Sequence, residues 1–292
     1  MIVSRVPDTA PDMTVSRYIA RAWPLIVPFA VRDAFKKRDV KVNGTRVNAD
    51  ARVTAGDEVC VYLPDKFAPG GLETVFADEN LIAFIKPCGL PVDADADGIG
   101  EDTALSRLQK AYPGAKLAHR LDAGTGGVML ASRSAFAEKA LLQAFSDHKI
   151  EKKYMALALG RMSKKEDTLL AFLEKDADSA RVRVSEKGGA NAKEIETRYR
   201  VTREYTVKGI TLSELEVSIP TGRTHQIRAH LSYVDHPLAG DDKYGNRAVN
   251  KSLGATEPCL WCRSLEICGA LGLEAYDGMR FRAPEWKWRI LS

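Results

Sequence analysis

A single carboxylate stands among basic residues in the stretch HRLDAGTGGVML, residues 119–130. If the stretch begins in an extended conformation, Arg120 and Asp122 point to the same face, because successive side chains of an extended chain alternate. His119 and Leu121 then point to the opposite face. The ordinary interpretation is an arginine–aspartate ion pair. The alternative is a reactive carboxylate at the edge of the apolar run that follows.

The three glycines of this stretch, Gly124, Gly126 and Gly127, first suggest a phosphate-binding loop. Their spacing matches neither the dinucleotide-binding fingerprint nor the Walker loop, which also needs a lysine followed by serine or threonine. A turn in which glycines adopt positive φ, or let another backbone approach closely, is the more ordinary interpretation. We therefore expect no nucleotide cofactor at this stretch.

Two further kinds of chemistry were weighed for Asp122. Metal binding requires additional oxygen or nitrogen ligands, and none stands nearby in the sequence. A retaining glycosidase requires a second carboxylate about 5 Å from the first, which the sequence alone does not exclude. The motif Cys259-Leu-Trp-Cys262, with Cys268 after it, has the spacing of half a zinc site, but no second such pair accompanies it. Buried structural cysteines are the better interpretation, so no metal is expected.

A second concentration of charged residues lies in PTGRTHQIRAHL, residues 220–231. The Pro-Thr-Gly sequence predicts the end of a strand, and the apolar residues after it predict one buried side of a helix. Arg223, His225 and Arg228 stand near the start of this helix, where the helix dipole favours acidic residues. Such a mismatch indicates an anionic partner, either a phosphate group or the side chain of Asp122.

The composition is typical of a soluble globular protein, because 45% of the 292 residues are hydrophobic and 28% are charged. No apolar run approaches the roughly 18 residues of a membrane-spanning helix. The N-terminus lacks the apolar core of a secretory signal, so we expect a cytoplasmic protein. A net charge of +4 permits a nucleic-acid partner without requiring one.

The segment PDKFAPGG, residues 64–71, has the proline and glycine content of a linker. It predicts a small α/β domain over residues 1–66 and a larger domain over residues 67–292. In the small domain we expect helices near residues 13–21 and 29–35 and a hairpin with an Asn-Gly turn at residues 40–47. Basic residues end the second helix, and a solvated helix end is their simplest explanation. The order of these elements nevertheless resembles the S-four-type RNA-binding domain.

The larger domain mixes short strands with few helices. We expect paired strands at residues 73–77 and 81–86, and further strands at residues 153–159 and 215–219. A serine-capped helix is predicted within residues 134–149. Strands and helices do not alternate regularly, so the sequence predicts an α+β fold with a mixed sheet.

Five ordered sequence blocks of the larger domain resemble the RluA-type family of pseudouridine synthases. The blocks are KPCGL at residues 86–90, HRLD at 119–122, EKKY at 151–154, GRTHQIRAHL at 222–231 and HPLAGDDKYG at 236–245. An RNA-binding domain in front of these blocks is typical of the family. Two features depart from it: Gly126 stands where serine is common, and CLWCRSLEIC, residues 259–268, stands where a histidine-containing strand is expected.

The resemblance implies a catalytic domain with a mixed, largely antiparallel β-sheet and flanking helices. It implies an enzyme that isomerises specific uridines to pseudouridine in structured RNA. That reaction has no redox step and loses no group, so neither a cofactor nor a metal is required.

The resemblance also implies which residues act. Asp122 would be the nucleophile or base at the ribose, and Tyr154 would stack on the uracil ring. Arg223 would be the ionic partner of Asp122. Arg120 would fill the space that a flipped-out uridine vacates, and the glycines would let RNA approach the backbone. Further RNA contacts are expected from His119, Thr125, Thr224, His225, Arg228, Lys36, Lys37, Arg38 and Lys41.

The expected partner is RNA, and the protein is expected to act as a monomer. Large-subunit ribosomal RNA is the commonest target for this domain order, with transfer RNA as the alternative. A non-catalytic RNA-binding or ribosome-assembly factor of the same fold is a rival interpretation, although the presence of Asp122, Tyr154 and Arg223 argues against it. A carboxylate-dependent glycosidase is the other rival, and an RNA-dependent reaction would exclude it.

Overall fold

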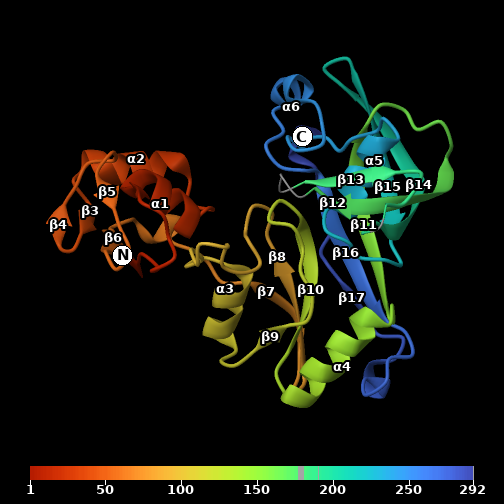
Figure 1. Ribbon diagram of the computed structural model, residues 1–292, viewed down its shortest axis with the longest axis horizontal. Coiled ribbons are helices and arrows are strands. Elements are labelled where there is room, and N and C mark those ends of the chain that lie inside the picture. Colours follow the sequence, from red (N-terminus) through yellow and green to blue (C-terminus); the bar gives the residue numbers. More distant parts are fainter. Residues whose placement is uncertain (177–180, 190, 292) are drawn as a thin grey trace. The chain divides into compact units, whose positions relative to one another are not determined.

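The computed structural model describes residues 1–176, 181–189 and 191–291 (Figure 1). The chain folds into two compact units. The first unit comprises Met1–Leu72 and Gly89–Ala115, and the second comprises Glu73–Cys88 and Lys116–Ser292. Compact units and sequence domains are different divisions of a chain, so the domain boundary expected at residue 66 remains a prediction. Among the described residues, no helix has the length and apolar character needed to cross a membrane.

The described residues of the first unit form short strands and three α-helices. A four-stranded sheet has the order β1-β6-β3-β4, and β2 pairs with β5. The elements are β1 (Ile2–Arg5), β2 (Met13–Thr14), α1 (Val15–Ala22), α2 (Pro28–Lys36), β3 (Val40–Val42), β4 (Thr45–Arg46), β5 (Arg52–Val53), β6 (Glu58–Val61), the 3-10 helix η1 (Asp65–Phe67) and α3 (Ala104–Ala111).

Local sequence explains these elements. The Thr14 hydroxyl accepts a hydrogen bond from the backbone N–H of Arg17 and so caps α1. Pro28 begins α2, where its missing N–H costs nothing. Asn43 and Gly44 have φ values of 49° and 77°, as the tight turn between β3 and β4 requires. The predicted helices and hairpin of this region are therefore confirmed.

The basic end of α2 lies on the surface of the first unit. Lys36, Lys37 and Arg38 are all exposed. Lys37 forms an ion pair with Asp33 at 2.7 Å, one helical turn earlier. On β3, the ammonium group of Lys41 lies 5.2 Å from the ring centre of Tyr62.

The second unit is built on one extended sheet, which contains eleven strands of the described residues. Its order is β13-β12-β14-β15-β11-β16-β10-β8-β7, with β17 paired to β16 and β9 to β10. The strands are β7 (Glu73–Ala77), β8 (Leu81–Lys86), β9 (Lys116–Leu117), β10 (Gly126–Ser132), β11 (Ile150–Leu159), β12 (Glu166–Lys175), β13 (Val182–Ser185), β14 (Lys193–Val207), β15 (Ile210–Ser218), β16 (Leu260–Ile267) and β17 (Arg280–Arg282).

The neighbouring strands are antiparallel except at one pair, where β10 runs parallel to β16. The helices are α4 (Ala135–Ser146), α5 (Gln226–Tyr233), α6 (Arg247–Leu253) and the 3-10 helices η2 (Glu274–Tyr276) and η3 (Arg289–Leu291). Helix α4 packs on β10, and α5 packs on β12, β13 and β14 (Figure 1). The predicted α+β class with a mixed, largely antiparallel sheet is confirmed.

Candidate active site

A cavity of about 480 Å³ opens where the loop before β10 meets the start of α5. Both stretches identified in the sequence contribute to it. Among the described residues that line it, Asp122 is the only acid. The predicted site residues found in the lining are His119, Arg120, Asp122, Thr125, Tyr154, Arg223, His225 and Arg228. Thr224 is exposed beside them and is not one of the described lining residues.

Asp122 lies in the tight turn that leads into β10, a strand buried along all seven of its residues. The backbone carbonyl of Asp122 accepts a hydrogen bond of 3.0 Å from the N–H of Thr125, which closes the turn. Lys86 is fully buried below it and donates to the carbonyl oxygens of Ala123 and Pro87, at 2.9 and 3.0 Å. Burial lowers the pKa of Lys86 to about 8, while the nearby acidic groups oppose that shift. The turn that carries Asp122 is thus fixed from within the core.

The alternation expected at residues 119–122 stays a prediction, because all four residues line the cavity. Arg120 is exposed and Leu121 is buried, while the carboxylate of Asp122 is 23% exposed and reaches the cavity. Nε2 of His119 accepts a hydrogen bond of 2.9 Å from the N–H of Leu130, and the ring stacks on Phe145 with 4.3 Å between centres. Burial lowers the pKa of His119 to about 3, so the ring is neutral. These contacts give His119 a role in packing, and its predicted RNA contact is untested.

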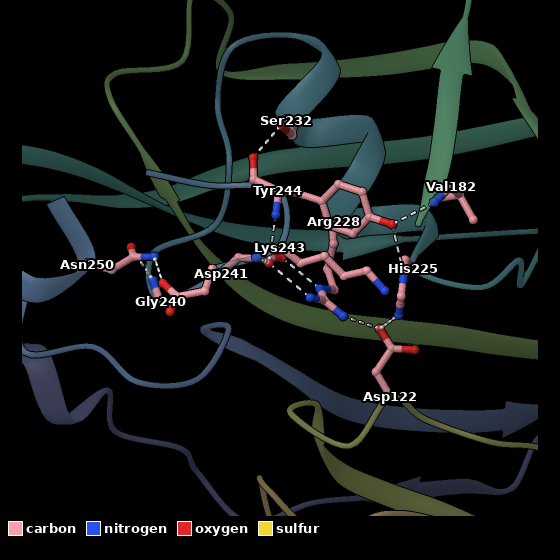
Figure 2. Close-up of polar contacts among 11 residues, drawn as sticks. Asp122, Val182, His225, Arg228, Ser232, Gly240, Asp241, Lys243, Tyr244 and Asn250 are labelled. Atoms are coloured by element: carbon pink, nitrogen blue, oxygen red, sulfur yellow. Dashed lines mark hydrogen bonds and ion pairs between the residues drawn. The ribbon is translucent and has the colours of Figure 1, made fainter. Parts of the chain in front are cut away.

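The carboxylate of Asp122 is paired with an arginine from α5. Nη1 of Arg228 lies 3.0 Å from Oδ2 of Asp122. The other side of the same guanidinium binds Asp241 through two hydrogen bonds, from Nε to Oδ2 at 2.7 Å and from Nη2 to Oδ1 at 2.9 Å (Figure 2). This fork geometry fixes the plane of the guanidinium. Arg228 therefore holds Asp122 in a set position.

Asp241 is completely buried and receives two more hydrogen bonds, from the N–H groups of Lys243 and Tyr244. Burial acts to raise the pKa of Asp241, but the charge and hydrogen bonds of Arg228 outweigh it and lower that pKa below its ordinary value. Burial acts in the same way to lower the pKa of Arg228, and the two carboxylates outweigh it and raise that pKa. Arg228 and Asp241 are therefore both charged, and Asp122 binds the same guanidinium group as Asp241.

The predicted pairing of Arg223 with Asp122 is wrong, because within the described residues Arg228 makes that ion pair. Helix α5 begins at Gln226, so Arg223 lies in the turn before it and is exposed on the rim of the cavity. The side-chain oxygen of Gln226 accepts the N–H of Arg223, which ties this turn to the helix. Arg228 lies within the helix and points inward. The sequence alone does not tell which of the two arginines pairs with Asp122, because this depends on the residue at which the helix begins.

His225 lies beside the same carboxylate. Its Nε2 atom is 3.8 Å from Oδ2 of Asp122, and its Nδ1 atom is 2.8 Å from the hydroxyl oxygen of Tyr244 (Figure 2). Tyr244 belongs to the block that ends in Lys-Tyr-Gly. Asp241 and Tyr244 were not predicted as site residues, although the sequence block at residues 236–245 contains both.

Tyr154 lies on β11 with its side chain lining the cavity, and only 7% of the residue is exposed. Burial raises the pKa of the Tyr154 phenol well above its ordinary value, and Cys262 and Asp122 add to this effect. The hydroxyl therefore keeps its proton at neutral pH. Lys152, two residues earlier on the same face of β11, also lines the cavity and donates to the carbonyl oxygen of Pro220 at 3.4 Å. Sequence reasoning missed Lys152.

The glycines after Asp122 make room for the protein rather than for RNA, so that prediction was wrong. A Cβ atom on Gly127 would lie 2.2 Å from the carbonyl oxygen of Cys262, on the parallel strand β16. A Cβ atom on Gly126 would lie 2.5 Å from the ring of Trp261. Close approach of another backbone was the simpler expectation, and it is confirmed. The Trp261 ring occupies the place where a serine at position 126 would need space.

The cysteines of the atypical segment do not gather into a zinc site within the described residues. All five cysteines are free, and Cys262 is completely buried. Cys259 is partly buried and Cys268 is exposed, so the expectation of burial fails for Cys268. Among the described residues, the group close enough to share a metal ion is Glu151, Glu266 and Cys268, which lies outside the cavity.

Comparison with known proteins agrees with this geometry. Residues 80–233 match the family model described as RNA pseudouridylate synthase. The chain is 31% identical to a ribosomal large subunit pseudouridine synthase C of Salmonella typhimurium, over 85% of this chain and 82% of that one. It is 30% identical to a ribosomal large subunit pseudouridine synthase D of Xylella fastidiosa, over 82% of this chain and 73% of that one.

A solved structure shows the same fold. The human RNA pseudouridylate synthase domain containing 1 aligns with a TM-score of 0.64 at 21% identity, covering 75% of this chain and 85% of that one.

Proposed function

Because the chain belongs to the RNA pseudouridylate synthase family, we propose that it isomerises specific uridines of large-subunit ribosomal RNA to pseudouridine. It is an RNA pseudouridine synthase by family. The choice of RNA is supported by the names of its relatives, which align with it over most of both chains. Transfer RNA is the less favoured target.

We propose Asp122 as the nucleophile or base at the ribose. The reaction breaks the bond between N1 of uracil and C1′ of the ribose, turns the base, joins C5 to C1′ and releases the proton of C5, while N1 takes up a proton. A single positioned carboxylate suits it, because nothing is oxidised or reduced and no group leaves. The observation that carries the proposal is that Asp122 is the one acid among the described lining residues, held by Arg228 at 3.0 Å.

The surrounding residues support the same chemistry. Arg228 offers the carboxylate a fixed counter-charge, and its double hydrogen bond to Asp241 means that little reorganisation is needed during reaction. Tyr154 is placed to contact the uracil ring as the base turns, with a hydroxyl that remains protonated.

Uracil within folded RNA must leave its stack before it reaches this cavity, at a cost of a few kcal/mol. Arg120 and Arg223 are exposed on the cavity rim, where neither guanidinium is engaged with Asp122. We assign Arg120 to the space that the flipped nucleotide leaves, and Arg223 to the RNA backbone near the cavity.

Residues 1–66, which belong to the first unit, are proposed as an S-four-type RNA-binding domain. Its support is the order of helix, helix and hairpin together with the exposed basic end of α2. Ile99, from the segment Gly89–Ala115, is part of the same hydrophobic core as residues of α1. A truncation after residue 66 would therefore divide this core, and point variants are the better test of RNA binding. We also propose that the enzyme acts in the cytoplasm as a monomer.

The test is tritium release from RNA that carries tritium at C5 of uridine. Total RNA from cells that lack this protein serves as substrate, and wild type is compared with Asp122→Asn. Release by the wild type alone is the expected result. RNA binding by both proteins without release from either would instead support a non-catalytic RNA-binding factor. A filter-binding assay on the same RNA separates loss of chemistry from loss of binding.

A further inference from the structure

A chain of polar contacts connects β13 to the carboxylate of Asp122 (Figure 2). The backbone N–H of Val182 donates to the hydroxyl oxygen of Tyr244 at 2.9 Å. That oxygen lies 2.8 Å from Nδ1 of His225, and Nε2 of the same ring faces Oδ2 of Asp122 at 3.8 Å. The His225 ring thus lies between Asp122 and Tyr244, and Tyr244 connects it to Val182.

The position of the protons follows from these contacts. Burial raises the pKa of the Tyr244 phenol, so its hydroxyl is protonated. Because the hydroxyl oxygen already accepts the N–H of Val182, its own proton is directed to Nδ1 of His225. A neutral imidazole has one donor and one acceptor nitrogen. With Nδ1 as the acceptor, the ring proton lies on Nε2, at the side of the ring that faces Asp122.

Burial favours the neutral form of the His225 ring. Burial is the main cause that lowers its pKa, and Asp122 opposes that shift. Arg228 and Lys243 lower it further, whereas Asp241 acts in the opposite direction. A neutral ring keeps the donor and acceptor roles fixed, which a doubly protonated ring would not.

The backbone of His225 is also unusual. Its φ and ψ angles are 54° and 18°, in the left-handed region that residues with a Cβ atom seldom occupy. Strain of this kind persists where surrounding contacts determine the conformation, and it gathers at functional sites. Here the edge of the imidazole ring contacts the Tyr244 ring, with 5.5 Å between ring centres.

Both contacts to the carboxylate reach the same oxygen. Arg228 and His225 approach Oδ2 of Asp122, at 3.0 and 3.8 Å. Figure 2 shows Oδ1 pointing away from both side chains. The hydrogen bond from Arg228, with the imidazole beside the same oxygen, restricts rotation of the carboxylate and leaves the other oxygen for the substrate.

We propose that His225 is a positioning residue that presents Oδ1 of Asp122 to the ribose, and that Tyr244 fixes the tautomer of His225 that does so. This inference rests on the proposed catalytic role of Asp122. It gives β13 a part in catalysis, because the N–H of Val182 orients the Tyr244 hydroxyl.

The kinetic test compares Tyr244→Phe, His225→Asn and the double variant in single-turnover reactions at saturating enzyme. Asparagine is chosen because it tolerates the left-handed conformation. Loss of one hydrogen bond predicts a rate constant about tenfold lower for Tyr244→Phe, with unchanged RNA affinity. The double variant should be no slower than His225→Asn, since the hydroxyl acts through the imidazole. Tyr233→Phe is the matched control, because Tyr233 is an exposed tyrosine of α5.

Multiplied effects in the double variant, or weakened RNA binding by Tyr244→Phe, would overturn the inference by showing that Tyr244 acts on RNA directly. A second readout is independent of turnover. Nitrogen-15 NMR of the imidazole groups, with the His225 signal identified by its absence from His225→Asn, should show the Nε2–H tautomer in the wild type and a mixture in Tyr244→Phe.

The two readouts separate the possible failures. An Nδ1–H tautomer in an active enzyme would overturn this inference alone. A wild type that forms no pseudouridine, yet has the Nε2–H tautomer, would overturn the proposed function and with it the catalytic purpose of the positioning, while the hydrogen-bond chain would stand.

Discussion

Arg223 and Arg228 are only five positions apart and line the same cavity, yet Arg223 is exposed and Arg228 is buried. On the anchored side, formed by Asp122, Arg228 and Asp241, every charged group has a partner within 3.0 Å. On the rim, formed by Arg120 and Arg223, the guanidinium groups are exposed. The contrast shows that arginines of one site can serve two different purposes. The buried arginine fixes the carboxylate that we propose to react, and the exposed arginines remain available for a large polyanion.

The largest effect is expected from breaking the anchored side. Arg228→Met would leave the buried Asp241 without its cation, which costs about 3–5 kcal/mol in free energy of unfolding. Activity should be lost as well, because Asp122 loses its fixed partner. Urea unfolding and tritium release measure the two effects.

A double variant sharpens this prediction. Arg228→Met combined with Asp241→Asn removes the uncompensated charge, so part of the stability should return while activity does not. Recovery of activity along with stability would show that Arg228 serves folding alone.

Acid should also weaken the anchored side through α5. His230 is buried next to Thr197, and burial lowers its pKa to about 4. In the unfolded chain His230 binds a proton below about pH 6.5, its ordinary pKa. In the folded chain it binds that proton only below about pH 4. Stability should therefore fall as the pH drops from about 6.5 to 4, by up to about 1.4 kcal/mol per pH unit.

His230→Gln removes this contribution, so its unfolding free energy should depend less on pH across that interval. The comparison uses the slope with pH of each protein, which cancels any constant loss of stability. Equal slopes would contradict the assignment. Asp241 has a pKa lowered in the folded state, so its own contribution disappears only at more acid pH, below about 4.

Variants of the rim should affect chemistry on structured RNA without affecting the fold. Arg120→Ala should leave the free energy of unfolding within about 0.5 kcal/mol of the wild type, as is usual for exposed positions. Its rate constant on a base-paired target should fall about 10- to 100-fold, because part of the flipping cost is no longer offset.

An RNA in which the same uridine is unpaired provides the control, since it needs little flipping. The defect should be much smaller on that RNA. A defect of equal size on both RNAs would assign Arg120 to the chemical step instead.

The smallest effect is expected in the first unit, far from the cavity in sequence. Lys36→Gln with Arg38→Asn should weaken RNA binding several-fold and make its dependence on salt shallower by about one to two in logarithmic slope. Asparagine suits position 38, where φ is 61°. Arg17→Gln with Arg52→Gln is the matched pair, because both arginines are exposed in the same unit. Equal losses in the two pairs would indicate general electrostatics rather than a binding face.

Much of this organisation could be predicted from local sequence. The Asn-Gly hairpin and the serine-capped helix α4 each depend on neighbouring residues, so short patterns suffice. The resemblance of five sequence blocks added the fold and the proposal of Asp122 as the reacting carboxylate. These parts needed no knowledge of distant contacts.

The remaining parts depend on contacts between distant segments. The choice of Arg228 over Arg223 follows from where α5 begins and from Asp241, thirteen residues after Arg228. Gly127 is required by the backbone of Cys262 on the parallel strand β16, which no local pattern indicates. The grouping of Gly89–Ala115 with the N-terminal unit likewise comes from packing across the chain.

The most direct measurement of the central claim is a map of pseudouridines in large-subunit ribosomal RNA from cells in which Asp122→Asn replaces the natural protein. The variant must accumulate to the normal level, which immunoblotting checks. We predict that one or a few pseudouridines vanish, and that the same sites vanish when the protein is deleted. If deletion removes these sites while Asp122→Asn retains them, Asp122 is not the catalytic carboxylate and this account of the cavity is wrong.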